Sequence, residues 1–169
     1  YMLEVPLDKE EYLKKGLLVL HDWANAVSYE DQEIINERGV IFEEWRLGRG
    51  PEDRLQQKTF PVMFYGSKYA ERLPIGDTAV FKYCPPENLR RFYHDWYRPD
   101  LQALVIVGDF DAKQVEIFVK EIFSQIPKRE QVRPHVYPEI PEHNDLKAVV
   151  ANDPQVRYTL IQYIVKIPT

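Results

Sequence analysis

Two glutamates at a helical spacing are the residues of this sequence best suited to chemistry. Glu37 and Glu44 lie seven positions apart, with Val40 and Ile41 between them. If the segment is helical, seven residues make two turns, so both carboxylates share one face with their Cα atoms roughly 10 Å apart. Carboxylates beside apolar residues are costly to bury unless they are paired or bind a cation. The spacing therefore fits either a metal-binding face or the solvated acidic edge of an ordinary surface helix.

The histidine spacing predicts no complete zinc site within this chain. The four histidines are His21, His94, His135 and His143. They form neither an H-x-x-E-H nor an H-E-x-x-H motif, and no two of them lie four positions apart. His94 stands beside an apolar stripe, so we expect it to be a partly buried structural residue. The single cysteine, Cys84, excludes an intrachain disulfide and a multi-cysteine metal site, and we expect its side chain to be half-buried.

Composition indicates a folded, acidic protein. The 169 residues are enough for a domain core, and 44% of them are hydrophobic, which argues against wholesale disorder. The formal net charge of −5 leaves no broad basic face, which argues against nucleic acid as a principal partner. The longest apolar runs, 17–20 and 103–107, are far shorter than the ~20 residues that cross a bilayer, so we expect no membrane span.

A helix is needed to bring the two glutamates onto one face, and the sequence pattern predicts one. Ser28 and Asp31 form a start signal and Gly48 an end signal, so this helix is expected to continue to about Leu47. Four more helices are expected, from Asp8 to about Val27, from Glu52 to about Tyr65, from Pro86 to about Trp96, and over Val115 to Phe123.

Three apolar stretches, 103–107, 147–151 and 157–167, are predicted to be strands. Because helices come first and strands last, the expected fold class is α+β, with several helices packed on a mainly antiparallel sheet. We expect a helical part with a strand–helix unit over 1–126, a proline-rich connector over 127–145, and strands over 146–169 that lead into a following part of the fold.

Four motifs follow one another along the chain. The run Glu37-Arg38-Gly39-Val40-Ile41-x-x-Glu44 is followed by Leu-Pro-Ile-Gly at 73–76, by a helix ending in Tyr-Arg-Pro-Asp at 97–100, and by Val-Gly-Asp at 107–109. As a set they resemble the inverzincins, the insulinase/pitrilysin family of zinc metallopeptidases, which includes the processing peptidases. The likeness covers nearly the whole chain.

The resemblance implies roles for both glutamates. Family members hold zinc with two histidines of an H-x-x-E-H helix and a later glutamate, and the glutamate of that motif is the general base. Glu44 matches the zinc-ligand glutamate. Glu37 matches the acidic residue one heptad earlier that supports the catalytic site from outside the ligand set. The implied fold is a half-lobe of such a peptidase, and the implied reaction is hydrolysis of peptides or proteins by zinc-activated water.

The sequence departs from the family because it has no H-x-x-E-H motif. Only 43 residues precede Glu44, so we expect the histidine ligands and the general base to lie upstream in a longer parent protein. That parent is expected to be a zinc metalloendopeptidase, whereas the 169-residue chain alone is expected to be inactive and to hold no zinc tightly. The alternative is a non-catalytic structural or peptide-binding lobe of the same fold.

The resemblance also implies partners and a compartment. The expected partners are a peptide or protein substrate and the rest of the same polypeptide or a second peptidase-like lobe. The segments 69–76 and 92–101 are most similar to bacterial members regarded as periplasmic or envelope enzymes. A periplasmic or cell-envelope location is therefore an expectation from resemblance.

Overall fold

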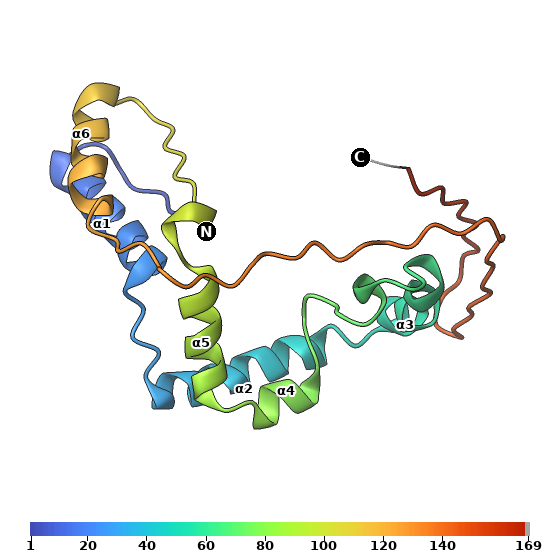
Figure 1. Cartoon of the computed structure of the whole chain (residues 1–169). Coiled ribbons are helices and arrows are strands. Elements are labelled where there is room, and N and C mark those ends of the chain that lie inside the picture. The colour runs from blue at the N-terminus through green and yellow to red at the C-terminus, as the bar shows by residue number, and fades with distance from the viewer. Residues whose placement is uncertain (168–169) are drawn as a thin grey trace. The chain divides into compact units, whose positions relative to one another are not determined.

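The computed structural model describes residues 1–167, which form helices joined by loops and extended chain (Figure 1). The α-helices are α1 (Glu10–Asn25), α2 (Asp31–Leu47), α3 (Pro51–Met63), α4 (Thr78–Tyr83), α5 (Pro86–Trp96) and α6 (Ala112–Phe123). The 3-10 helices are η1 (Lys68–Ala70) and η2 (Pro99–Leu101). Five of the α-helices lie where the sequence predicts them. The short α4, whose first turn is capped by the side chain of Asp77, was not predicted.

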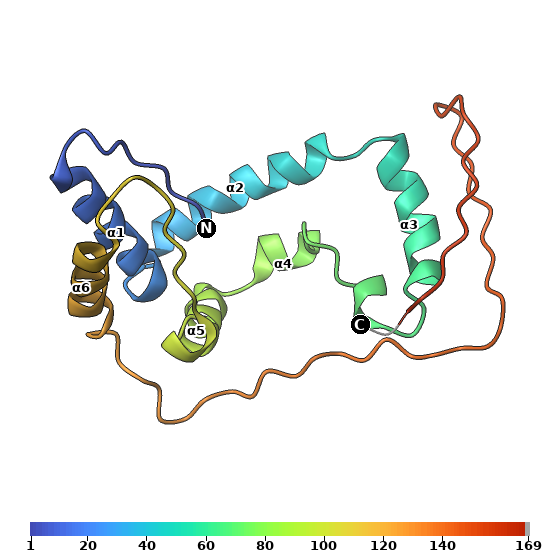
Figure 2. The same cartoon turned by 90° about the horizontal axis from the view of Figure 1, so that it is seen from above.

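The predicted α+β class is wrong, because residues 1–167 contain no strand and no sheet. The predicted strands at 103–107, 147–151 and 157–167 are irregular chain, and the orange-to-red segment after α6 is traced without a helix or an arrow (Figure 2). Many of their apolar side chains stay in solvent, with Val107 92% and Ile161 90% exposed, whereas Leu104 and Ile106 are half-buried. A strand needs a neighbouring chain for its backbone hydrogen bonds, and a local apolar pattern carries no information about that neighbour.

Two compact units divide the chain. The first comprises residues 1–31 and 85–134, and the second comprises residues 32–84 and the chain from 135 onward. The three parts predicted from the sequence, 1–126, 127–145 and 146–169, stay a prediction. Residues 168 and 169, at the end of the last of these parts, lie outside the described residues.

The first unit is built on the packing of α1 against α6. Leu17 of α1 and Val115 of α6 are among its few buried apolar side chains, together with Ile126. Tyr93 of α5 is also buried, and its hydroxyl donates a hydrogen bond to the carbonyl of Trp23 at 2.8 Å. Because the last carbonyls of a helix have no donor within the helix, this bond caps the end of α1.

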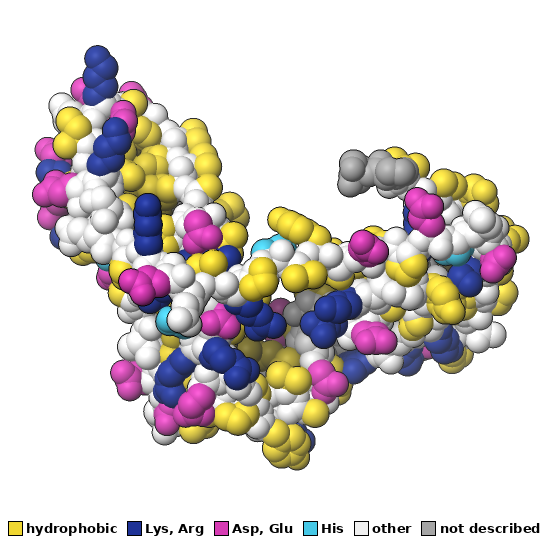
Figure 3. Space-filling view, viewed as in Figure 1, with side chains coloured by type: hydrophobic (Ala, Val, Ile, Leu, Met, Phe, Trp, Pro, Cys, Tyr) yellow, Lys and Arg dark blue, Asp and Glu magenta, His cyan; other side chains and the backbone are white. Residues whose placement is uncertain are grey.

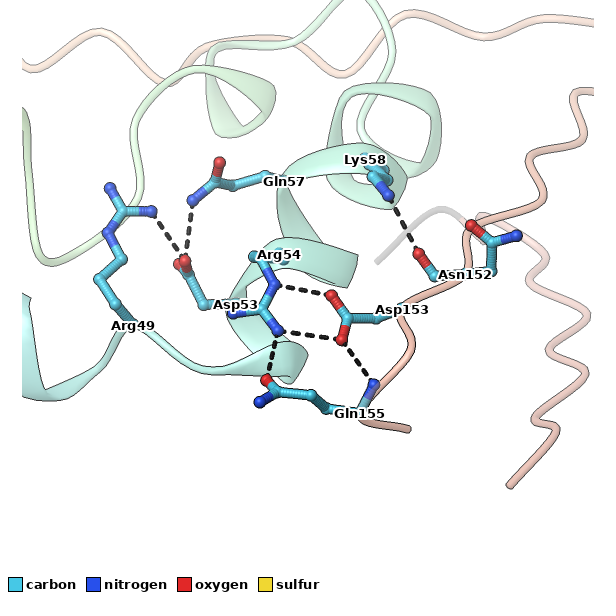
Figure 4. Close-up of polar contacts among 8 residues, drawn as sticks. All are labelled: Arg49, Asp53, Arg54, Gln57, Lys58, Asn152, Asp153 and Gln155. Carbon is cyan, nitrogen blue, oxygen red and sulfur yellow. Dashed lines mark hydrogen bonds and ion pairs between the residues drawn. The ribbon is translucent and has the colours of Figure 1, made fainter. Parts of the chain in front are cut away.

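The second unit contains α2, α3 and α4, and α3 holds the later chain by polar contacts. Lys58 of α3 donates to the carbonyl of Asn152 at 3.0 Å, and Arg54 contacts Asp153 and Gln155 in the turn at residues 153–156 that follows (Figure 4). Apolar side chains of this unit remain at the surface, among them Leu47, Tyr65 and Ile161, and Figure 3 shows yellow side chains exposed on the visible face of the chain. The unit is therefore held by polar contacts more than by a large apolar core.

Candidate metal-ligand site

Glu37 and Glu44 both lie on α2, which confirms the helix predicted to unite them. Both residues are exposed, and neither side chain makes a hydrogen bond or ion pair with any residue of the described chain. Because water solvates both carboxylates, neither bears the desolvation cost expected for a buried carboxylate. The pair forms a solvated acidic edge, and both carboxylates are free to accept a cation.

A shallow groove runs along one face of α2. Its lining residues are Asn36, Gly39, Val40, Glu43, Glu44 and Leu47. These positions recur every three or four residues, so they share one side of the helix. Val40 is 59% and Leu47 77% exposed, which makes the groove largely apolar. Glu44 therefore places a carboxylate at an open apolar face, whereas Glu37 is not among the lining residues.

The two neighbouring carboxylates of the groove differ in their partners. Glu43 accepts a hydrogen bond from Arg46 at 2.8 Å, one turn further along α2. The Glu44 side chain has no such partner among residues 1–167. Carboxylate oxygen is one of the ligand types that zinc accepts in proteins. Glu44 thus fits a single zinc ligand, whereas Glu43 already has a hydrogen-bond partner on its own helix.

The four histidines form no metal site with Glu37 and Glu44 among the described residues. Within the described residues, no three His, Cys, Asp or Glu side chains gather into a group that could hold a metal ion. The predicted burial of His94 is wrong, because its side chain is 59% exposed. Of the apolar stripe beside it on α5, only Tyr93 is buried. Cys84 is half-buried, as predicted.

No helix within residues 1–167 is both long enough and apolar enough to cross a bilayer.

Comparison with known proteins identifies the family. Residues 84–169 match the family described as "Peptidase M16 inactive domain". The chain belongs to the M16 peptidase family. This confirms the resemblance to the insulinase/pitrilysin zinc metallopeptidases and processing peptidases. The matched residues of this M16 chain begin after Glu37 and Glu44, so the match covers α5 and α6 and leaves out α2.

M16 relatives extend the similarity over almost the whole chain. The chain is 30% identical to the probable zinc protease PqqL of Escherichia coli over 99% of its own length and 18% of that protein. It is 35% identical to the zinc protease PQQL-like of Arabidopsis thaliana over 87% of its length and 16% of that protein. The chain therefore spans about a fifth or less of the length of these relatives. Both relatives are named as zinc proteases.

Two solved structures are similar to this chain in fold. The crystal structure of the first half of the periplasmic protease PqqL from Escherichia coli matches with a TM-score of 0.72 and 30% identity. The match covers 79% of this chain and 29% of that one. A mutant of the ferredoxin protease FusC, in complex with Arabidopsis ferredoxin, matches with the same TM-score at 26% identity, over 78% of this chain and 15% of that one.

Proposed function

We propose that this chain is part of a zinc-dependent metalloendopeptidase, in which Glu44 supplies one metal ligand. The observation that carries the proposal is the unpaired carboxylate of Glu44 at the open apolar groove of α2. A helix is a rigid support for a ligand, and an exposed carboxylate can approach a metal ion without first breaking another contact. Glu37, two turns earlier on the same helix, supports the site from outside the ligand set.

The names of the relatives support zinc as the metal and proteolysis as the reaction. Zinc held at this site would activate a water molecule for attack on a peptide carbonyl. The remaining ligands and the general base are assigned to sequence outside this chain, because its described residues contain no group of three ligand side chains. The 169-residue chain alone is therefore proposed to be inactive and to bind zinc weakly.

The proposed substrates are peptides or proteins, and the proposed partners are the rest of the same polypeptide or a second peptidase-like lobe. The FusC structure has ferredoxin as its bound protein, which supports protein substrates for members of this family. A periplasmic location is proposed on the description of PqqL from Escherichia coli as a periplasmic protease.

A second function is favoured by a different observation. The family description for residues 84–169 is that of an inactive domain, and it favours a non-catalytic structural or peptide-binding lobe as the second candidate. In that case Glu37 and Glu44 are surface charges of α2, without a metal. The two functions differ in what the charge of Glu44 does for the full-length protein.

The test compares Glu44→Gln with Glu43→Gln in the full-length parent protein. Both substitutions remove one exposed negative charge from adjacent positions of α2, but only Glu44 lacks a partner in the described chain. We expect Glu44→Gln to abolish stoichiometric zinc, measured by elemental analysis, and to abolish peptide cleavage, while Glu43→Gln retains both. Retention of zinc and full activity by Glu44→Gln contradicts the assignment. A wild-type parent without zinc and without cleavage favours the non-catalytic lobe.

A further inference from the structure

We propose that Arg38 is a positioning residue. It fixes the rotation of α2 about its own axis, so that the helix face carrying Glu44 stays open. The inference rests on the function proposed above, because it concerns the same site. Arg38 lies on α2 between Glu37 and Gly39, and its side chain is half-buried while those of both glutamates are exposed. The hydrogen-bond partners of the Arg38 side chain indicate its role.

The guanidinium of Arg38 binds the end of α4. Its Nη1 donates to the carbonyl of Lys82 at 3.3 Å, and its Nη2 donates to the carbonyl of Cys84. These carbonyls lie 44 and 46 positions further along the chain, and both belong to the second unit, as Arg38 does. The fork of the guanidinium lets one side chain reach two acceptors at once, which a lysine cannot reproduce.

The end of α4 needs an external donor because of the residues that follow it. The last carbonyls of a helix have no donor within the helix. A continuing helix would provide the N–H of the residue four positions on, which for Lys82 is Pro86. Pro85 and Pro86 have no N–H, so the backbone cannot complete this end. Arg38 provides the missing donor, and its positive charge is favourable at the negative end of a helix.

A second contact lies on the same side of α2. Phe42 follows Arg38 by one turn, and the ammonium of Lys82 lies 5.8 Å from the centroid of its ring. At about 100° per residue, Arg38 and Phe42 lie roughly 120° and 160° around the helix axis from Glu44. The contacts with α4 are thus on the side of α2 away from the groove. They oppose rotation of the helix and leave the face with Glu44 open.

The test uses three variants of the full-length parent. Arg38→Met removes both hydrogen bonds, Arg38→Lys keeps the charge but not the fork, and Arg46→Met is the control. Arg46 is on the same helix, but Glu43 is the only hydrogen-bond or ion-pair partner of its side chain among the described residues. Zinc affinity is measured by chelator competition, kcat and KM by peptide cleavage, and hydrogen exchange by peptides covering residues 78–84.

We expect Arg38→Met to lower zinc affinity by about 10- to 100-fold, the usual effect of losing a residue that orients a metal ligand. kcat should fall with KM unchanged, because Arg38 does not line the groove, and exchange at residues 78–84 should become faster. Arg38→Lys should give an intermediate zinc affinity, and Arg46→Met should match the wild type in all three measurements.

The outcomes separate this inference from the proposed function. If Arg38→Met keeps wild-type zinc affinity while Glu44→Gln loses zinc, Arg38 does not position the site and the proposed function stands. If Glu44→Gln keeps zinc, the proposed function itself is wrong. If Arg38→Met does not fold, as judged by circular dichroism, Arg38→Lys decides: native folding with reduced zinc affinity supports the inference, and unchanged affinity overturns it.

Discussion

Arg54 and Asp153 form a two-contact ion pair that joins α3 to the turn at residues 153–156, although 99 positions separate them. Arg54 Nε lies 2.6 Å from Asp153 Oδ2, and Arg54 Nη2 lies 2.9 Å from Asp153 Oδ1 (Figure 4). Arg54 also donates to the amide oxygen of Gln155 at 2.6 Å. The Asp153 side chain is only 5% exposed. A two-point contact of this kind fixes the relative orientation of the two side chains, because the planar guanidinium and the planar carboxylate are joined by two hydrogen bonds.

Replacing Asp153 with asparagine should release this turn from α3. The amide has nearly the same size but no charge, and it can accept at only one oxygen. The N–H of Gln155 donates to Asp153 Oδ1 at 3.0 Å, and the N–H of Val156 donates to the Asp153 carbonyl. We expect faster hydrogen exchange at both amides in Asp153→Asn.

The matched control for that substitution is Asp53→Asn. Asp53 accepts from Arg49 at 2.7 Å, four residues earlier, so its pair tethers no distant segment. Surface pairs at this spacing contribute only about 0.3–0.5 kcal/mol. Exchange at Gln155 and Val156 should be unchanged in the control. Equal exchange rates in Asp153→Asn and the wild type would show that the ion pair does not hold the turn.

The docking of the turn should also depend on pH. The hydrogen bonds from Arg54, followed by the one from the Gln155 N–H, lower the pKa of Asp153 to about 2. The unfolded value is about 3.9, so the folded state favours the charged carboxylate. This stabilisation is complete above the unfolded pKa and is lost as pH falls through the folded pKa. We expect the turn to remain docked at pH 3 and to detach near pH 2, as measured by NMR titration of the Asp153 carboxyl. A midpoint near 4 would contradict this.

Gly39 should be replaceable by alanine with a gain in stability. It lies inside α2, and an added Cβ would meet no atom within 4 Å. Alanine is more favourable than glycine inside a helix by about 1 kcal/mol. We expect Gly39→Ala to raise the free energy of unfolding of the 169-residue chain by about this amount in urea denaturation. A decrease would show that another part of the chain needs the space.

Gly76→Ala is the contrasting substitution. Gly76 has a φ of 84°, and an added Cβ would lie 2.8 Å from Phe81 Cε1. Both the positive φ and the close ring disfavour a side chain, so we expect a loss of about 1 kcal/mol or more. The change in the free energy of unfolding should therefore have opposite signs at these two exposed glycines. This difference separates a general effect of alanine from the effect of local backbone geometry.

Tyr93→Phe should weaken the end of α1 while leaving the aromatic packing of the first unit in place. Tyr93 is 7% exposed, and its ring centroid lies 5.0 Å from that of Tyr29 and 4.4 Å from that of Tyr97. The substitution removes only the hydroxyl, which donates to the Trp23 carbonyl at 2.8 Å and accepts a longer hydrogen bond from the Val27 N–H at 3.4 Å. A hydrogen bond of this kind contributes about 1 kcal/mol, so unfolding in urea should occur at a lower concentration. An unchanged midpoint would show that water replaces the hydroxyl without loss.

The sequence by itself determined five of the six described α-helices and the family. The placement of α2, with Glu37 and Glu44 two turns apart, follows from start and end signals and from periodicity, which are local properties of the chain. The motif order was sufficient for the M16 relationship. The contacts of Arg38 with the end of α4 were not predicted, because α4 itself was not predicted; the Pro85-Pro86 pair just after it was the one local signal that a helix ending there would lack backbone donors.

Only the tertiary structure decided which segments find partners. The apolar stretch at 157–167 has the pattern of a strand, yet it forms no sheet within residues 1–167, because strand pairing depends on a neighbouring chain. His94 is exposed for the same kind of reason, since burial depends on what packs against α5 and not on the residues beside it in sequence. The Arg54–Asp153 pair, formed across 99 positions, has no local signature at all. Local patterns specify helices because helical hydrogen bonds lie within four residues, whereas these contacts join residues far apart in the chain.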